Sequence, residues 1–217
     1  MNEDTKQFLD ELKSRPDVLG VIMFGSWARG NNRPDSDVDL VIILTEGYRR
    51  TVEYKNGQAF EIIYTTVKGA VEFWQIKKDD CADLWAVAKI LYDKDGTMVE
   101  LKKQAEEIIK VGKKPVDQYQ KGQFEFSIKD ELVAIKSIAE KDPTTASLVI
   151  SKTALLLTEL FFDFRQMWTP APKQRLIKLK VISPELYKLF EEFYSTPVLK
   201  NKIELIEKIT PLVFEIN

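Results

Sequence analysis

One stretch constrains this chain more than any other: Gly25-Ser26, then ten intervening residues, then Asp37-Val38-Asp39. An apolar run over residues 18–24 leads into Gly25, which predicts a buried strand that ends in a tight turn. A second apolar run follows Asp37, and because a strand alternates its faces, the carboxylates of Asp37 and Asp39 point the same way. At about 4 Å and an effective dielectric near 20, they repel each other by about 4 kcal/mol. Such a pair needs a bound cation, a shared proton or a solvated face.

The composition limits the chemistry that this pair can take part in. The chain of 217 residues has no histidine and a single cysteine, Cys81. These counts exclude histidine bases, nucleophiles and metal ligands, an internal disulfide and a cysteine zinc site. Carboxylates, Lys, Arg, Ser, Tyr and Cys81 remain, together with a hard metal that prefers oxygen ligands. The formal net charge of −2 argues against bulk attraction to nucleic acid or to an anionic membrane.

The chain is expected to be a cytoplasmic protein with no membrane segment. Its first ten residues are acidic and polar, unlike a signal peptide. The most apolar region, residues 148–164, is interrupted by Lys152, Glu159 and Asp163, each of which is costly at the centre of a bilayer. We therefore expect this region to form a buried helix.

The first half of the sequence predicts a sheet with flanking helices. Asn56-Gly57 is a strong hairpin signal, and the strand after it places Glu61 on one face with Ala59 and Ile63, which is unusual for an acidic side chain. The patterns predict helices over residues 5–13 and 67–77, and strands over residues 18–24, 37–44, 50–54, 58–65 and 87–92.

The second half predicts helices only. A helical pattern starts at Thr97, and Gly112 and Pro115 then break the chain, so we expect domains over residues 1–112 and 113–217. Helices are predicted over residues 116–141, 144–167, 173–180, 184–194 and 198–209. The fold class is therefore α+β: an N-terminal mixed β-sheet with flanking helices, followed by an all-α helical bundle. Five phenylalanines are expected in the bundle core or in the interface of a homodimer: Phe124, Phe126, Phe161, Phe162 and Phe164.

These residues carry a resemblance to a known family. Residues 25–30 (GSWARG) and 35–40 (DSDVDL) resemble the signature of the DNA polymerase beta-like nucleotidyltransferases. The closest patterns are those of the minimal nucleotidyltransferases and of the adenylyltransferases that modify aminoglycoside and lincosamide antibiotics. The resemblance covers roughly the first 95 residues, and Glu61 stands where the family carries its third carboxylate.

The resemblance implies a metal-dependent transfer from ATP or another nucleoside triphosphate. Asp37, Asp39 and Glu61 would be the catalytic carboxylates and would hold Mg²⁺, which prefers carboxylates together with substrate phosphates. Glu61 would be either a metal ligand or the general base; a carboxylate of the helical half, Asp130 or Glu131, could instead supply the base. The nucleotide would contact Gly25, Ser26, Arg29 or Arg33, Ser36 and Lys173.

Two functions remain open at this point. The first is transfer of a nucleoside monophosphate to a hydroxyl of an antibiotic-like small molecule, with the helical half binding the acceptor or forming a dimer. The alternative is an antitoxin-type protein that binds or adenylylates a partner protein. The size of the helical half favours the first, because minimal members of the family lack about a hundred residues of it. A template-dependent polymerase is disfavoured by size and by the lack of a basic stripe.

Overall fold

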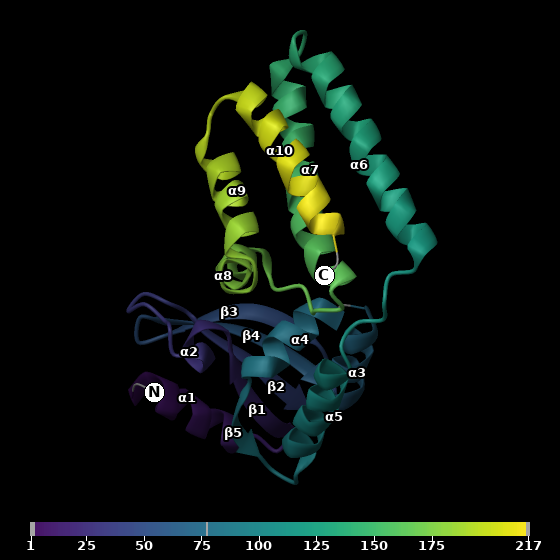
Figure 1. The fold of residues 1–217 in the computed structure, drawn as a ribbon. Coiled ribbons are helices and arrows are strands. Elements are labelled where there is room, and N and C mark those ends of the chain that lie inside the picture. Colours follow the sequence, from purple (N-terminus) through teal and green to yellow (C-terminus); the bar gives the residue numbers. More distant parts are fainter. Residues whose placement is uncertain (1–2, 77, 216–217) are drawn as a thin grey trace. The chain divides into compact units, whose positions relative to one another are not determined.

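The computed structural model describes residues 3–76 and 78–215. The chain divides into two compact units (Figure 1): residues 1–111, called here the N-terminal unit, and residues 112–217, the helical unit. In chain order the N-terminal unit consists of α1 (Glu3–Lys13), β1 (Val18–Phe24), α2 (Gly25–Arg29), β2 (Val38–Leu44), β3 (Arg49–Lys55), β4 (Gln58–Thr66), α3 (Val67–Ile76), α4 (Lys78–Val87), β5 (Lys89–Asp93) and α5 (Thr97–Val111).

The five strands form one mixed sheet in the order β3-β4-β2-β1-β5. β2 and β4 run parallel, and the other neighbouring pairs run antiparallel. The predicted hairpin is present, with Lys55 opposite Gln58 around Asn56-Gly57, and both turn residues have the positive φ angles that such a turn requires. The predicted α+β class is therefore confirmed, because a mixed sheet with flanking helices precedes a helical region.

The two faces of the sheet are covered by different helices. Leu40 and Ile42 point to the face that packs against α1, whereas Val41 and Ile43 point to the face that packs against α3, α4 and α5. Figure 1 shows α1 and α5 on opposite sides of the sheet. Strand alternation produces this division, so the side chains of one strand enter two separate cores.

The structure corrects the prediction for residues 78–92. No helix was expected over residues 78–86, yet α4 spans Lys78–Val87, and β5 begins at Lys89 instead of at Val87. Asp79 and Asp80 favour a helix start here because acidic groups stabilise the positive end of the helix dipole. Burial of Trp85 then holds the helix on the sheet. Lys77, the last residue of the predicted helix over 67–77, lies outside the described residues.

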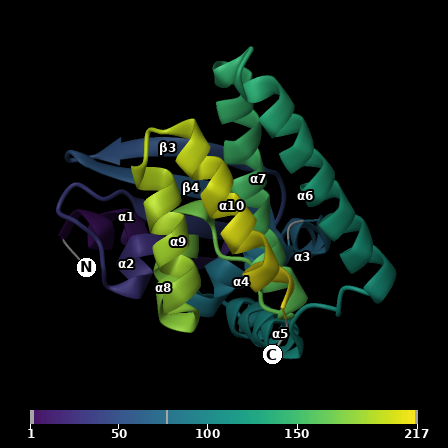
Figure 2. The same ribbon diagram turned by 45° about the horizontal axis from the view of Figure 1, so that its top comes forward.

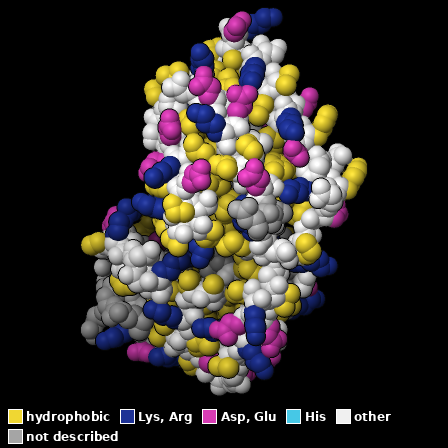
Figure 3. Space-filling view, viewed as in Figure 1, with side chains coloured by type: hydrophobic (Ala, Val, Ile, Leu, Met, Phe, Trp, Pro, Cys, Tyr) yellow, Lys and Arg dark blue, Asp and Glu magenta, His cyan; other side chains and the backbone are white. Residues whose placement is uncertain are grey.

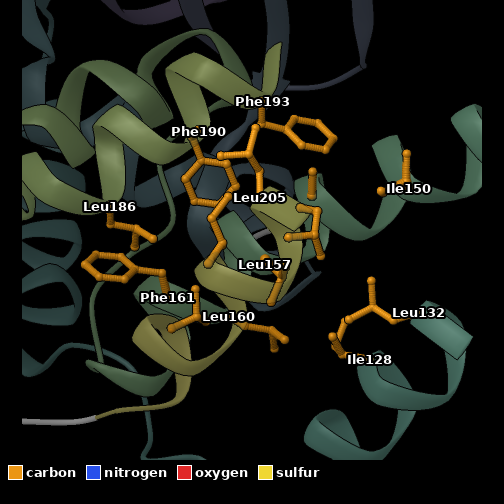
Figure 4. Packing of buried hydrophobic residues seen from close by; sticks show 14 of the residues in the cluster. Ile128, Leu132, Ile150, Leu157, Leu160, Phe161, Leu186, Phe190, Phe193 and Leu205 are labelled. Carbon is orange, nitrogen blue, oxygen red and sulfur yellow. The ribbon is translucent and has the colours of Figure 1, made fainter. Parts of the chain in front are cut away.

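The helical unit consists of α6 (Gln118–Ala139), α7 (Pro143–Phe164), α8 (Pro172–Ile182), α9 (Pro184–Ser195) and α10 (Leu199–Phe214). Asp117 and Asp142 cap α6 and α7, each accepting a backbone N–H three residues on. In the views of Figures 1 and 2, α7 runs beside α6 and α10. Its apolar side chains belong to one buried cluster with those of α9 and α10, and Figure 4 shows Leu157, Phe190 and Leu205 within it.

By length and composition α7 could cross a membrane, and half of its most apolar window is buried inside the structure. Ile150, Leu157 and Phe161 belong to the core of the helical unit. These burials are compatible with the core helix of a soluble protein, which passes the same test of length and hydropathy.

The phenylalanines of α6 and α7 have different surroundings. Phe161, Phe162 and Phe164 are buried in the core, whereas Phe124 and Phe126 of α6 are 37% and 68% exposed. The expectation of a core position is therefore confirmed for the three on α7, whereas Phe126 is not in the core and its place in a homodimer interface stays a prediction.

α10 continues five residues beyond the predicted end at Ile209 and contains Pro211. Proline lacks a backbone N–H and usually ends or kinks a helix, so its position inside α10 is unusual. The guanidinium of Arg165 donates to the carbonyls of Leu212, Val213 and Glu215. It thereby supplies hydrogen-bond donors to backbone carbonyls at the end of α10 that have no partner within the helix.

Both signs of charge occur on the surface of the helical unit. Figure 3 shows its Lys and Arg side chains interspersed with Asp and Glu on the face that is drawn. Several of them pair, including Lys129 with Glu125 at 2.7 Å, and Lys136 with Glu207. Such exposed pairs contribute little to stability.

Candidate active site

Three carboxylates from two strands converge at one end of β2. Asp39 and Glu61 are register partners in the parallel pair β2–β4, so their side chains lie side by side on one face. Asp37 precedes β2 by one residue and is exposed. One carboxylate oxygen from each of the three lies within 4.8 Å of the others. We call these three residues the acidic triad.

Gly25 lies directly against the acidic triad. Phe24 pairs with Asp39 across β1 and β2, which places the next residue beside the Asp39 carboxylate. A Cβ atom at Gly25 would lie 1.7 Å from Asp39 Oδ2, and the φ angle of Gly25 is +66°. Only glycine satisfies both conditions, because an L side chain is strained at this φ and would overlap the carboxylate.

The loop between α2 and β2 is held by Ser36. Its carbonyl accepts hydrogen bonds from Trp27 Nε1 at 3.2 Å and from Gln58 Nε2 at 3.0 Å. Its hydroxyl accepts the backbone N–H of Arg33 at 2.9 Å. Ser36 therefore shapes the turn that presents Asp37, and Trp27 packs against the α1 side of the sheet.

Arg50 binds Glu61, a contact that the sequence analysis missed. Its Nε donates to Glu61 Oε1 at 3.1 Å, and its Nη2 contacts the same oxygen. The hydrogen bonds to Glu61, followed by its charge, raise the pKa of Arg50. The hairpin register could have revealed this pair, because pairing Lys55 with Gln58 sets Val52 opposite Glu61 and places Arg50 on the diagonal.

The other predicted nucleotide contacts in the N-terminal unit differ in their exposure to solvent. Ser26 and Arg29 lie half-buried in the short helix α2, which ends at Gly30. Arg33 is exposed and pairs with Asp35 at 3.4 Å.

The remaining predicted residues belong to the helical unit. Lys173, near the start of α8, and Asp130, on α6, are both exposed. The Glu131 carboxylate accepts hydrogen bonds from Lys152 at 2.9 Å and from Thr153 at 2.6 Å. These contacts give Glu131 a structural role between α6 and α7, which makes it a poor candidate for a general base.

Comparisons with known proteins bear on the family and the fold of this chain. A family model described as "Nucleotidyltransferase domain" matches residues 5–142. Among solved structures, the chain is similar to a nucleotidyltransferase-like protein from Exiguobacterium sibiricum 255-15, with a TM-score of 0.52 and 14% sequence identity over 98% of this chain and 73% of that chain. At this identity the likeness shows the fold alone. No curated protein matches the chain.

Proposed function

Because the chain belongs to the nucleotidyltransferase domain family, we propose that it moves a nucleoside monophosphate from ATP to a hydroxyl of a small-molecule acceptor in a reaction that depends on Mg²⁺. The family supports nucleotidyl transfer in general. ATP, Mg²⁺ and the small-molecule acceptor are our proposals.

The observation that carries this proposal is the convergence of the acidic triad beside Gly25. The donor set suits Mg²⁺, which takes oxygen ligands at 2.0–2.1 Å, so that two ligands of one ion lie at most about 4.2 Å apart. Carboxylate oxygens within 4.8 Å of one another need only small movements to meet this condition. A cation also explains why Asp37 and Asp39 are tolerated so close together.

When bound, Mg²⁺ supplies charge neutralisation of the triphosphate and polarises the α-phosphate. Asp37 and Asp39 would hold it, with Glu61 as a further ligand or as the general base. Gly25 leaves room for the close approach of a phosphate on the β1 side of Asp39, and the Ser26 hydroxyl lies next along the chain. We assign the β- and γ-phosphates to this side, with Arg29 and Ser36 as further proposed contacts.

Arg50 gives Glu61 a positioning partner in this scheme. A carboxylate held by a guanidinium keeps a fixed direction. Glu61 is thereby oriented to accept the proton of an incoming hydroxyl. The side chain of Arg50 is 62% exposed, so it can change partners without breaking a buried pair.

We further propose that the protein is cytoplasmic and that the helical unit serves acceptor binding or homodimerisation. The mixed charges on its surface offer no support for binding nucleic acid in bulk.

The test is incubation with Mg²⁺ and isotopically labelled ATP against a panel of hydroxylated small molecules and candidate protein partners, with mass spectrometry of all products. Transfer of label to a small hydroxyl compound supports the proposal, and transfer to a protein supports the antitoxin-type alternative. Absence of Mg²⁺-dependent ATP binding by the intact chain would refute transfer from ATP to either kind of acceptor, and would leave only the binding form of the antitoxin-type alternative.

A further inference from the structure

A cavity of about 350 Å³ lies within the N-terminal unit, on the sheet face that carries Asp39 and Glu61. Val41 and Ile63 line it from the sheet, and α3 and α4 supply its other walls. Its volume lies in the range of small-molecule sites. Four aromatic side chains line it: Tyr48, Phe73, Trp74 and Trp85. Trp74 and Trp85 are buried and pack edge to face with ring centroids 5.7 Å apart, whereas Tyr48 and Phe73 are 73% and 44% exposed.

The cavity begins next to the acidic triad. Val41 follows Asp39 by two residues on β2, and Ile63 follows Glu61 by two residues on β4, so all four side chains share one face. Two residues along a strand span about 7 Å. Arg50 connects the two regions directly, because it lines the cavity and binds Glu61.

The strand order determines on which side of the reacting phosphorus the cavity lies. Gly25 lies against Asp39 from β1, whereas Glu61 and Arg50 come from β4 and β3 on the other side of β2. In phosphoryl transfer the attacking and leaving oxygens are roughly in line, on opposite sides of phosphorus. With the leaving pyrophosphate on the Gly25 side, the incoming hydroxyl arrives from the Glu61 side, where the cavity lies.

The charge of the cavity lining narrows the class of ligand further. Among the described residues that line it, Glu72 carries the one carboxylate, which is exposed and lies 3.7 Å from the ammonium of Lys68. Arg50 adds a positive charge at the end nearest the triad. The neutral polar groups of the lining are few: the hydroxyls of Thr65, Thr66 and Tyr48, the indole N–H groups of Trp74 and Trp85, and the weakly polar thiol of Cys81. Such a lining suits a flat apolar molecule with few polar groups and does not suit a polycation.

We propose that this cavity binds the body of the acceptor, and that the acceptor is a neutral hydroxylated molecule with an aromatic or apolar body. The inference rests on the proposed function, because the side from which the hydroxyl arrives depends on where the triphosphate binds. In the balanced step, the acceptor oxygen bonds to the α-phosphorus, the bond to the bridging oxygen breaks, pyrophosphate leaves with that electron pair, and the hydroxyl proton passes to the Glu61 carboxylate.

The test compares two probes, 2-(2-naphthyl)ethanol and ATP with Mg²⁺, by equilibrium titration of the intact chain and of two variants. Phe73→Ala removes an exposed cavity wall from α3. Ile76→Ala, on the same helix and 75% exposed, is the matched control because Ile76 does not line the cavity. Neither variant disturbs a buried side chain, so both are expected to fold.

We expect Phe73→Ala to weaken binding of the naphthyl probe by about tenfold or more and to leave the affinity for ATP within about twofold. Ile76→Ala should change neither affinity. In the presence of Mg²⁺ and ATP, the naphthyl probe should be adenylylated, and an aminoglycoside, which is a polycation, should not displace it.

Three results would overturn the inference: no binding of the naphthyl probe, binding that Phe73→Ala leaves unchanged, or displacement by the aminoglycoside. If Phe73→Ala weakened the binding of ATP and not that of the naphthyl probe, the cavity would hold the nucleobase and the inference would be wrong. Failure of ATP to bind with Mg²⁺ would instead refute the proposed function itself, and the naphthyl titration distinguishes the two cases.

Discussion

Replacing Gly25 with alanine tests whether the turn after β1 and the acidic triad form one site. The substitution adds a single methyl group at a residue whose φ angle is +66°. The new Cβ would lie 1.7 Å from Asp39 Oδ2 and 2.6 Å from Asp39 Cγ. The change therefore acts in two ways: it strains the backbone, and it displaces a carboxylate of the triad.

The two effects have different sizes and different readouts. A left-handed conformation costs a non-glycine residue about 1–2 kcal/mol, which should appear as a loss of folding stability. The overlap of the new Cβ with Asp39 Oδ2 changes the position of the carboxylate. Real Cβ contacts are essentially never shorter than 3.0 Å, so Asp39 Oδ2 must move by at least 1.3 Å, the difference between 3.0 and 1.7 Å. A displacement of about 1 Å in a catalytic geometry can cost about 10²-fold in rate.

Gly30→Ala is the matched control for the backbone effect. Gly30 has a φ angle of +75°, and a Cβ added there meets nothing within 4 Å. The Gly30→Ala variant should lose about the same 1–2 kcal/mol of folding stability as Gly25→Ala, without moving Asp39. Urea unfolding of each full-length variant measures the stability change. Isothermal titration with Mg²⁺ and ATP, together with the rate of pyrophosphate release, measures the effect on the site.

We expect both variants to lose similar stability and Gly25→Ala alone to lose Mg²⁺-dependent ATP binding and transfer. Equal activity of the two variants would refute the reasoning, because it would mean that the position of Asp39 against Gly25 is irrelevant to the chemistry.

Four further predictions concern single side chains. Asp39→Asn should abolish Mg²⁺-dependent ATP binding in calorimetry and leave the urea midpoint unchanged or higher, since it removes a repelling charge. Glu61→Gln should reduce turnover more than affinity for ATP if Glu61 is the base, and an equal loss of both would indicate a metal ligand. Burial raises the pKa of Cys81 to about 12, so its alkylation at about pH 8 should be roughly 10³-fold slower than that of a free thiol. The raised pKa also stabilises the folded state below about pH 8.5, and this contribution is lost as the pH rises toward the pKa of Cys81 in the folded protein. Arg165→Met should lower the free energy of unfolding in urea by about 2 kcal/mol, because it leaves the carbonyls at the end of α10 without their charged donor.

Local patterns were sufficient for the part of the site that lies along single strands. The alternation around Asp39 and around Glu61 set the face of each side chain before any pairing was known. The convergence of Asp39 and Glu61 depends on the parallel pairing of β2 with β4, which no local pattern specifies. The resemblance to a family supplied Glu61 as the expected third carboxylate, and the structure shows the pairing that brings it beside Asp39.

The features that were missed depend on contacts between distant residues. The pair between Arg50 and Glu61 depends on the hairpin register, which joins residues eleven positions apart. α4 escaped prediction because burial of Trp85 against the sheet, and not a clear amphipathic period, holds it in place. The end of α10 depends on Arg165, which directly follows α7 and donates to the last carbonyls of α10.

The two-residue turn at Asn56-Gly57 governs chemistry that occurs some distance from it. The turn decides which residues of β3 and β4 face each other, and hence that Arg50 reaches Glu61. A slip of β3 by one position against β4 would send the guanidinium of Arg50 to the α1 side of the sheet, away from Glu61. A deletion or insertion in this turn would therefore free Glu61 from Arg50, while the pairing of β2 with β4 would still hold Asp39 and Glu61 side by side.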